Sequence, residues 1–216
     1  MPYDFPEFCL EKALAFRILH MDNIPDALRI GARSITSAAT NQAYVPIGNS
    51  DIIEKRKKKA VTAPPGGVLA DYVPFYFSPR SMMLFNILTG YSVTKRRPDE
   101  IAILVTSVPH LVKRQTAFVF SDGHALMAQT KFFNDPGELH RIDWDILRRS
   151  DSMKSDSDPG KSQRYQAELL VHDRVEVADL LGLACFDGTS RAKLERVASE
   201  AGVTITVRER PKWYPR

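Results

Sequence analysis

Two stretches of this chain carry side chains that could do chemistry: a glutamate in the last third and a basic run in the first third. Glu168 lies in YQAELLV, directly after a long polar segment. A carboxylate there either lies half exposed on a strand, as most glutamates do, or points into a cleft. The run EKRKKK covers residues 54–59. Such a block forms either a solvated helix face or a surface that binds phosphate groups.

Two further side chains lie where the chain is expected to turn. His124 follows Gly123 after a short apolar segment and could cap a turn or belong to a site. Arg80 could pair with an acid or face a phosphate group. The other four histidines show no metal-ligand spacing, and two cysteines are too few for a zinc site or a disulfide framework. We therefore expect no bound metal. The sequence also lacks P-loop, GxGxxG and GxSxG motifs.

The segment GGVLADYVPFYFSPRSMMLFNIL is the centre of the expected fold. Residues 72–77 predict a strand, and Pro74 indicates an edge strand or a bulge because it lacks a backbone N–H. Ser78 is expected to cap the next helix, with a proline in its first turn and Gly90 just past its end. A strand that leads directly into a capped helix either binds a phosphate with its free N–H groups or serves as scaffold.

The remaining elements are mixed without strict alternation, which predicts an α+β fold in a single domain spanning residues 1–216. Further strands are expected at 13–20, 100–108, 117–120, 165–171 and 203–209, and the segment LACF at 183–186 precedes the last helix. Further helices are expected at 24–30 with Asn23 as cap, at 51–60 with Asp51 as cap, and at 125–130, 143–149 and 189–202. Long polar loops at 32–50 and 132–162 separate them, and loops of that length are often functional.

The composition is that of a globular protein with a modest basic excess. Hydrophobic residues make up 44% of the 216 residues, charged residues 26%, and the formal net charge is +4. This charge favours polyanionic partners without identifying one. The start, MPYDFPEFCLEK, has acids and prolines where a signal peptide needs a basic start and an apolar run. No stretch approaches the roughly 20 apolar residues of a membrane span, so we expect a soluble, cytoplasmic protein without membrane partners.

Several of these segments together resemble one known family. PPGGVLADYVPFYFSPRSMML, FVFSDGHA and RYQAELLV, in that order and spacing, are similar to DarT, the DNA ADP-ribosyltransferase toxin of DarT–DarG toxin–antitoxin modules. The opening RILHMDNIPDALRIG and the terminal KWY also fit, so the resemblance covers nearly the whole chain. It implies a PARP-like ADP-ribosyltransferase fold, with a mixed, split β-sheet core and flanking helices. It further implies that NAD⁺ donates ADP-ribose to N3 of thymidine in single-stranded DNA, and that the macrodomain antitoxin DarG removes the mark.

The resemblance also assigns residues. It implies that Glu168 is the catalytic glutamate and that Arg56, within EKRKKK, is the arginine described in the family as proton acceptor. The implied cofactor contacts are Arg17, Ile18, Leu19, Asp26, Ser34 and Arg56, with a loop at about residues 39–58 over NAD⁺. The implied substrate contacts are His124, Met83, Arg164 and Tyr165, with the loop from His124 to Glu168 over the DNA and Lys154 and Lys161 as further candidates. Many relatives have a histidine where this chain has Arg17, which could donate to ribose hydroxyls or to the pyrophosphate.

The chemistry explains why such residues are needed. Breaking the nicotinamide–ribose bond builds positive charge on the ribose, and a carboxylate near the sugar stabilises that charge. Thymine N3 must lose its proton to attack, but a guanidinium group keeps its own proton. We therefore expect Arg56 to stay charged and to hold a thymine carbonyl or a cofactor phosphate. Two alternatives stay open: the same fold acting on guanine in DNA, on RNA or on a protein, and a non-enzymatic nucleic-acid-binding module.

Overall fold

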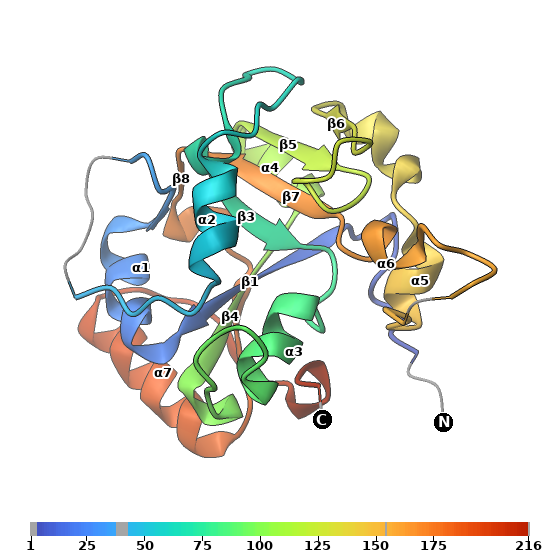
Figure 1. Cartoon of the computed structure of the whole chain (residues 1–216). Coiled ribbons are helices and arrows are strands. Elements are labelled where there is room, and N and C mark those ends of the chain that lie inside the picture. Colours follow the sequence, from blue (N-terminus) through green and yellow to red (C-terminus); the bar gives the residue numbers. More distant parts are fainter. Residues whose placement is uncertain (1–3, 38–42, 154, 216) are drawn as a thin grey trace.

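The computed structural model describes residues 4–37, 43–153 and 155–215, and its main feature is one eight-stranded sheet flanked by helices (Figure 1). The strands are β1 (Leu14–His20), β2 (Ala32–Arg33), β3 (Tyr72–Tyr76), β4 (Ile101–Ser107), β5 (Phe118–Ser121), β6 (Phe132–Phe133), β7 (Glu168–His172), β8 (Arg174–Val175), β9 (Gly182–Cys185) and β10 (Val207–Glu209). The helices are α1 (Ile24–Ile30), α2 (Ser50–Arg56), α3 (Met82–Thr89), α4 (Val108–Arg114), α5 (Trp144–Arg148), α6 (Lys161–Arg164) and α7 (Gly188–Glu200). The mixed sheet and its helices confirm the α+β expectation.

The sheet is nearly divided between β1 and β3. Its strand order is β10-β9-β4-β1-β3-β7-β5-β6, and β2 and β8 form a separate pair. Strand β1 pairs with β4 along its whole length, whereas its pairing with β3 is the single register pair Phe16 and Tyr76. Strand β3, in contrast, pairs with β7 along all five residues. Two half-sheets therefore meet along a narrow line, and the backbone edges on either side of that line can take other partners.

Pro74 lies at this line, and the expectation of an edge strand or bulge was wrong. β3 is an interior strand, with Pro74 opposite Leu170 of β7. Its carbonyl oxygen accepts a hydrogen bond from Arg17 Nη1 at 3.1 Å. N–H and C=O of one residue point the same way in an antiparallel strand, so the missing N–H lies on the β1 side. A proline is tolerated there because the sheet is open at that point.

Apolar side chains pack on both faces of the sheet. Ala15 and Leu19 of β1 point into a cluster that includes Val73 and Leu169, while Phe16 on the opposite face packs in another cluster. That second cluster contains Leu84 and Ile87 of α3 together with Ile18 and Trp213. Helix α7 covers the β9–β10 end of the sheet, next to α1 (Figure 1). Since Arg17 shares a face with Ala15 and Leu19, packing on both sides of it leaves its side chain little choice of direction.

The strand-to-helix corner after β3 differs from the expectation. Helix α3 begins after Ser81, whose Oγ accepts from Leu84 N at 3.2 Å, and Gly90 ends it in the left-handed conformation as predicted. Ser78 is not the cap. Its Oγ is buried 3.2 Å from Tyr165 Oη. The strand and the helix are thus separated by a bend, and the predicted direct corner with Ser78 at its helix terminus does not form.

Of two other predicted caps, Asp51 is wrong, and Asn23 has the predicted position without a capping hydrogen bond. Helix α2 is capped by Asn49, whose Oδ1 accepts from the backbone N–H groups of Asp51 and Ile52, and the helix ends at Arg56. Asn23 precedes α1 as predicted, but its side chain makes no capping hydrogen bond. In both cases the sequence indicated correctly that an asparagine or aspartate stands near the helix start. Tertiary contacts decided which hydrogen-bond partner each side chain has.

Two further predicted elements have different structures. Residues 125–130 form turns instead of a helix, held by the hydrogen bonds of Met127 N and Thr130 Oγ1 to the carbonyl of His124. The last strand covers only Val207–Glu209 of the predicted 203–209. Within the described residues, no helix is both long and apolar enough to cross a membrane.

Candidate active site

Glu168 is the first residue of β7, the strand next to β3, and its carboxylate is buried. The residue is 2% exposed. Oε2 accepts from Arg56 Nη1 at 2.9 Å, and Oε1 accepts from the backbone N–H of Ala125 at 3.1 Å. The backbone is also fixed, because Glu168 N donates to Ser121 Oγ at 3.1 Å. Of the two alternatives from the sequence, the carboxylate therefore points inward.

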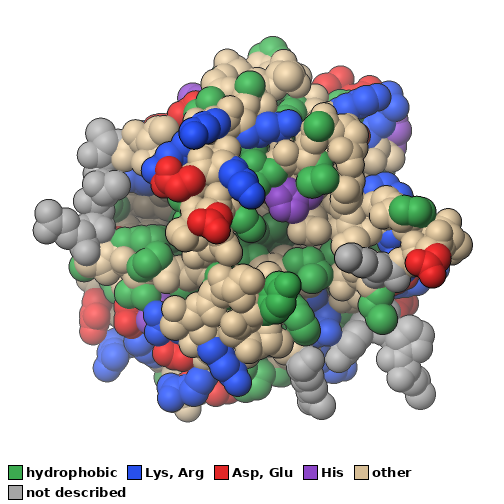
Figure 2. Space-filling model, in the orientation of Figure 1, with side chains coloured by type: hydrophobic (Ala, Val, Ile, Leu, Met, Phe, Trp, Pro, Cys, Tyr) green, Lys and Arg blue, Asp and Glu red, His purple; other side chains and the backbone are tan. Residues whose placement is uncertain are grey.

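Arg56 reaches this carboxylate from the end of α2, across 112 positions of the sequence. It is 8% exposed, whereas Lys55, Lys57 and Lys58 around it are exposed. Its Nη2 is buried and has no hydrogen-bond partner among the described residues. The basic run is therefore divided: Arg56 enters the interior, Lys59 is half-buried and donates to Met127 O at 3.2 Å, and the other members face solvent. Figure 2 shows the molecule hollowed near the centre of the view, beside the position of α2, with Lys and Arg side chains along the upper rim.

Arg17 forms the β1 side of the same site. Besides the bond from Nη1 to Pro74, its Nε is buried without a hydrogen-bond partner in the described part of the chain. Burial lowers the pKa of Arg17, and the neighbouring charge of Arg56 adds to that lowering, while Tyr44 and Tyr76 oppose it. Two guanidinium groups thus lie close enough to repel each other, each with an unused N–H. Such a pair suits a ligand rich in oxygen acceptors.

Tyr76 completes the cluster, although sequence reasoning missed it. It lies directly opposite Glu168 in the β3–β7 register, and its hydroxyl donates to Met83 Sδ at 3.4 Å. Burial raises its pKa, the charge of Glu168 raises it further, and Arg56 and Arg17 partly offset this. The phenol therefore stays protonated beside the carboxylate. Alternation along YVPFYF, which places Tyr76 on the face of Pro74, was the available signal.

Apart from Arg56 on α2, the predicted cofactor contacts are divided among three places. Arg17, Ile18 and Leu19 follow one another on β1 at the split, but the side chains of Ile18 and Leu19 are buried in opposite apolar clusters. Only their backbone groups could therefore meet a ligand. Asp26 lies on α1 and accepts from Arg29 Nη2 at 2.8 Å. Ser34 is buried after β2, with its N–H donating to Asp173 O at 2.7 Å.

Two of the predicted substrate contacts lie next to the carboxylate. His124 directly precedes Ala125, whose N–H binds Glu168, and its own Nδ1 accepts from Leu126 N at 3.2 Å. Met83 reaches the site through the hydroxyl of Tyr76. Both side chains are partly exposed, so a ligand could touch them.

The other two are used differently. Arg164 Nε pairs with Asp143 and its two terminal nitrogens pair with Asp158, whose hydrogen bond raises the pKa of Arg164. Tyr165 is 3% exposed and donates its hydroxyl to Arg80 O at 3.0 Å. In this conformation neither side chain faces an incoming base: Arg164 holds the long loop to α6, and Tyr165 packs beneath it.

The remaining loop and corner cations follow the same pattern. Lys161 pairs with Asp151 at 2.8 Å, and Lys154 lies outside the described residues, as do residues 39–42 of the expected NAD⁺ loop. Arg80, considered from the sequence as a partner of an acid or a phosphate group, makes hydrogen bonds to other parts of the chain. It donates to Ser150 Oγ and to the carbonyl of Lys212, which ties the bend after β3 to the C-terminal segment. Among the described residues, no group of three or more His, Cys, Asp or Glu side chains could hold a metal ion.

Known proteins resemble this chain in sequence and in structure. The family model described as "ssDNA thymidine ADP-ribosyltransferase, DarT" matches residues 16–215. A DNA ADP-ribosyl transferase of Escherichia coli O127:H6 is 38% identical over 216 residues, covering 99% of both chains. One from Thermus sp. strain 2.9 is 36% identical over 157 residues, covering 73% of each.

Two solved structures of the Thermus protein extend the likeness to the fold. Thermus sp. 2.9 DarT in complex with ADP-ribosylated ssDNA superposes with a TM-score of 0.88 at 29% identity, covering 100% of both chains. The same protein in complex with NAD⁺ superposes with a TM-score of 0.83 at 28% identity, covering 95% of this chain and 98% of that one. A split sheet with a buried Arg–Glu pair at the start of β7 is therefore found in a chain that matches these enzymes along nearly its whole length. The chain belongs to the DarT family of single-stranded DNA thymidine ADP-ribosyltransferases.

Proposed function

We propose that this protein is a toxin that transfers ADP-ribose from NAD⁺ to N3 of a thymine base in single-stranded DNA and so blocks DNA replication. The observation that carries the proposal is the buried Arg56–Glu168 pair at the start of β7. In the reaction, the bond between the nicotinamide nitrogen and C1 of its ribose breaks, and nicotinamide leaves with the electron pair. Thymine N3 forms the new bond to C1 and releases its proton. Residues 1–216 act in this proposal as one catalytic domain.

Glu168 is proposed as the residue that steadies the ribose while it carries positive charge. An ionised carboxylate in a water-poor site interacts more strongly with a developing cation than it would in bulk water. Its position is fixed by two donors, Arg56 Nη1 and Ala125 N, so little reorganisation is needed as the charge appears. The second function of the carboxylate would be to hold a ribose hydroxyl.

Arg56 is proposed to act as a fixed positive charge and hydrogen-bond donor. Nη1 is occupied by Glu168, which leaves the buried Nη2 for a ligand oxygen. A thymine carbonyl held there would make loss of the N3 proton easier, and a cofactor phosphate could use the same group. Deprotonation of the guanidinium is not required in either case.

NAD⁺ fits the donors at this site. Its pyrophosphate and ribose oxygens need N–H and O–H groups, and Arg17 Nε and Arg56 Nη2 are buried donors with no partner among the described residues. Met83 and His124 lie at the same opening and are proposed as substrate contacts. Asp26, Ser34 and the backbone of Ile18 and Leu19 are proposed as further cofactor contacts on the adjoining elements.

The proposed partners are single-stranded DNA and a DarG-type macrodomain antitoxin that removes the modification, with the cytoplasm as the place of action. The exposed Lys55 of α2, with Lys57 and Lys58 just after it, supports a polyanionic substrate. A single strand is also the form in which a base can enter a pocket without first leaving a duplex stack.

Mass spectrometry of defined oligonucleotides tests this function. An oligonucleotide with one thymine, incubated with protein and NAD⁺, should gain ADP-ribose. The matched oligonucleotide with N3-methylthymine should gain none, because N3 is blocked. Modification of a guanine oligonucleotide, of RNA or of a protein instead would support the same fold acting on another acceptor. A non-enzymatic binder would modify none of these, and its effect in cells would survive Glu168→Ala.

A further inference from the structure

Asn23 makes a pair of contacts that neither its helix nor the site described above explains. The side chain is buried. Its Nδ2 donates to Val45 O at 2.8 Å, and its Oδ1 accepts from Val45 N at 2.9 Å. The amide thus binds both backbone groups of one residue, as a neighbouring strand would. Asparagine supplies one donor and one acceptor at the required spacing, whereas aspartate supplies two acceptors and alanine neither.

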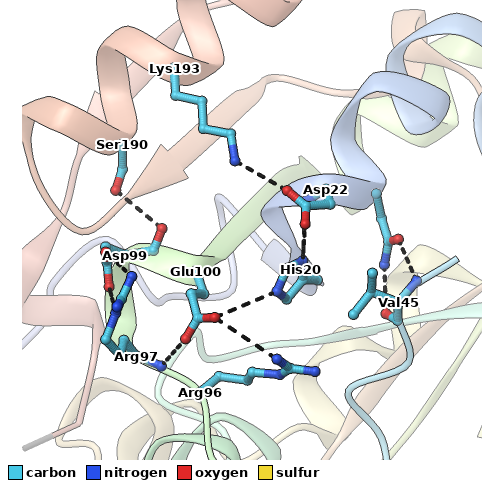
Figure 3. A network of polar contacts seen from close by, with 10 residues as sticks. His20, Asp22, Val45, Arg96, Arg97, Asp99, Glu100, Ser190 and Lys193 are labelled. Carbon is cyan, nitrogen blue, oxygen red and sulfur yellow. Dashed lines mark hydrogen bonds and ion pairs between the residues drawn. The ribbon is translucent and has the colours of Figure 1, made fainter. Parts of the chain in front are cut away.

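Asn23 is itself held in place by a polar network. It ends the short 3₁₀ turn η1 (Met21–Asn23), and Asp22 of that turn accepts from Lys193 Nζ of α7 at 3.1 Å. The Asp22 carboxylate also lies 3.5 Å from His20 Nδ1, and His20 Nε2 lies 4.0 Å from Glu100. Figure 3 shows these groups linking α7, β1 and the start of β4, with the Val45 segment at the edge of the network. Asn23 is therefore a fixed attachment point.

The attached segment leads to the active site at both ends. Tyr44 precedes Val45 and is one of the groups that support the charge of Arg17. On the other side, Ile47 is buried and Asn49 caps α2, whose last residue is Arg56. Tyr44 is 45% exposed, so burial of its own side chain does little to hold it. The Asn23 clamp fixes the backbone of the next residue, Val45.

We propose that Asn23 is a positioning residue for NAD⁺ binding: by clamping Val45 it holds Tyr44 against Arg17 and closes that part of the chain over the cofactor. This inference rests on the proposed function. It assigns Asn23 no contact with the ligand. Losing the clamp should weaken binding of NAD⁺ far more than it slows the chemical step, because Glu168 and Arg56 are held by other contacts.

Steady-state kinetics of Asn23→Ala and Asn23→Asp test the proposal, with Ser107→Ala as the matched control. Ser107 is also a buried polar side chain, and it caps α4 by accepting from His110 N. All three variants should lose stability, since a lost cap or hydrogen bond typically costs about 1 kcal/mol. Both Asn23 variants should raise KM for NAD⁺ about tenfold with kcat within about twofold, as expected for loss of one or two hydrogen bonds. Ser107→Ala should leave KM unchanged.

Hydrogen exchange of a peptide covering residues 43–49 provides a second readout. Exchange should be faster in both Asn23 variants than in the wild type or in Ser107→Ala. If the Asn23 variants raise KM no more than Ser107→Ala, or if residues 43–49 keep wild-type protection, the positioning role is wrong. Failure of the wild type to modify any oligonucleotide would instead refute the proposed function. The exchange result would then still show whether Asn23 holds residues 43–49.

Discussion

Replacing Glu168 by glutamine removes one charge from the active site and almost no volume. The carboxylate accepts from Arg56 Nη1 at 2.9 Å and from Ala125 N at 3.1 Å. An amide can face only one of these donors with its oxygen and must turn its own NH₂ toward the other. The variant therefore loses one hydrogen bond in every orientation and leaves Arg56 buried without its counter-charge.

These losses set the expected magnitudes. A hydrogen bond to a charged group contributes about 1.5–3 kcal/mol, and breaking a buried ion pair costs about 3–5 kcal/mol. We expect Glu168→Gln to lower the free energy of unfolding by about 3 kcal/mol. For a chain of 216 residues this corresponds to a Tm decrease of roughly 6–12 °C. Loss of one preorganised electrostatic group should lower kcat by about 10²–10³.

The assay is NAD⁺-dependent modification of a single-thymine oligonucleotide, together with urea unfolding of the same preparations. Asp179→Asn is the matched control, because Asp179 is also buried and accepts from Thr116 Oγ1 at 2.7 Å and from Arg114 Nε at 3.4 Å. It should lose stability and keep its activity. A folded Glu168→Gln protein with kcat within tenfold of the wild type would refute the role assigned to the carboxylate.

Three further predictions concern the charge of residue 56, salt and alkaline pH. Arg56→Lys should keep measurable activity, because a fixed charge is retained. The pH–rate profiles of the wild type and this variant should have the same limbs. A limb present in the wild type and absent in the variant would mean that Arg56 takes the proton. Oligonucleotide affinity, measured by fluorescence anisotropy, should fall steeply between about 50 and 200 mM salt. The double variant Lys55→Ala, Lys58→Ala should reduce the slope of log affinity against log salt concentration by up to about two. An unchanged slope would mean that the DNA phosphates bind elsewhere. Burial raises the pKa of the Cys185 thiol from 9.0 to about 11. The folded state therefore binds the thiol proton more tightly than the unfolded state does. The resulting contribution to the free energy of unfolding, about 2–3 kcal/mol, is complete below pH 9 and is lost as the pH rises to 11. Between pH 9 and 11, the free energy of unfolding should decrease less for Cys185→Ser than for the wild type. An equal decrease would contradict the role assigned to the thiol.

Much of the local structure could be read from the sequence. The apolar run at 100–108 and the alternation at 13–20 predicted β4 and β1, because a side-chain period of two fits a sheet packed on both faces. Gly90 predicted the end of α3, because it alone of its neighbours adopts a positive φ at little cost. The family motifs identified Glu168 and Arg56 as a pair of interest.

Long-range contacts, however, decided what each polar side chain does. An asparagine or serine at a helix start can cap the helix or bind any backbone group that folding brings close, and the sequence does not rank these partners. Neither Asn23 nor Ser78 makes the expected capping hydrogen bond. Asn23 binds the backbone of Val45, and Ser78 lies against the hydroxyl of Tyr165. Likewise, Arg164 is of a residue type that often contacts DNA, but it pairs with Asp143 and Asp158. The local sequence pattern does not predict these two ion pairs.

By itself, then, the sequence determined most of the elements, the family, and the importance of Glu168 and of the basic run at 54–59. Only the tertiary structure decided that Arg56 of that run turns inward, that it meets Glu168 across 112 positions, and that Tyr76 stands opposite. The physical reason is that burial of charge is permitted only where a partner is supplied from elsewhere in the chain. That partner depends on the register of β3 against β7 and on the opening between β1 and β3, which are properties of the assembled sheet.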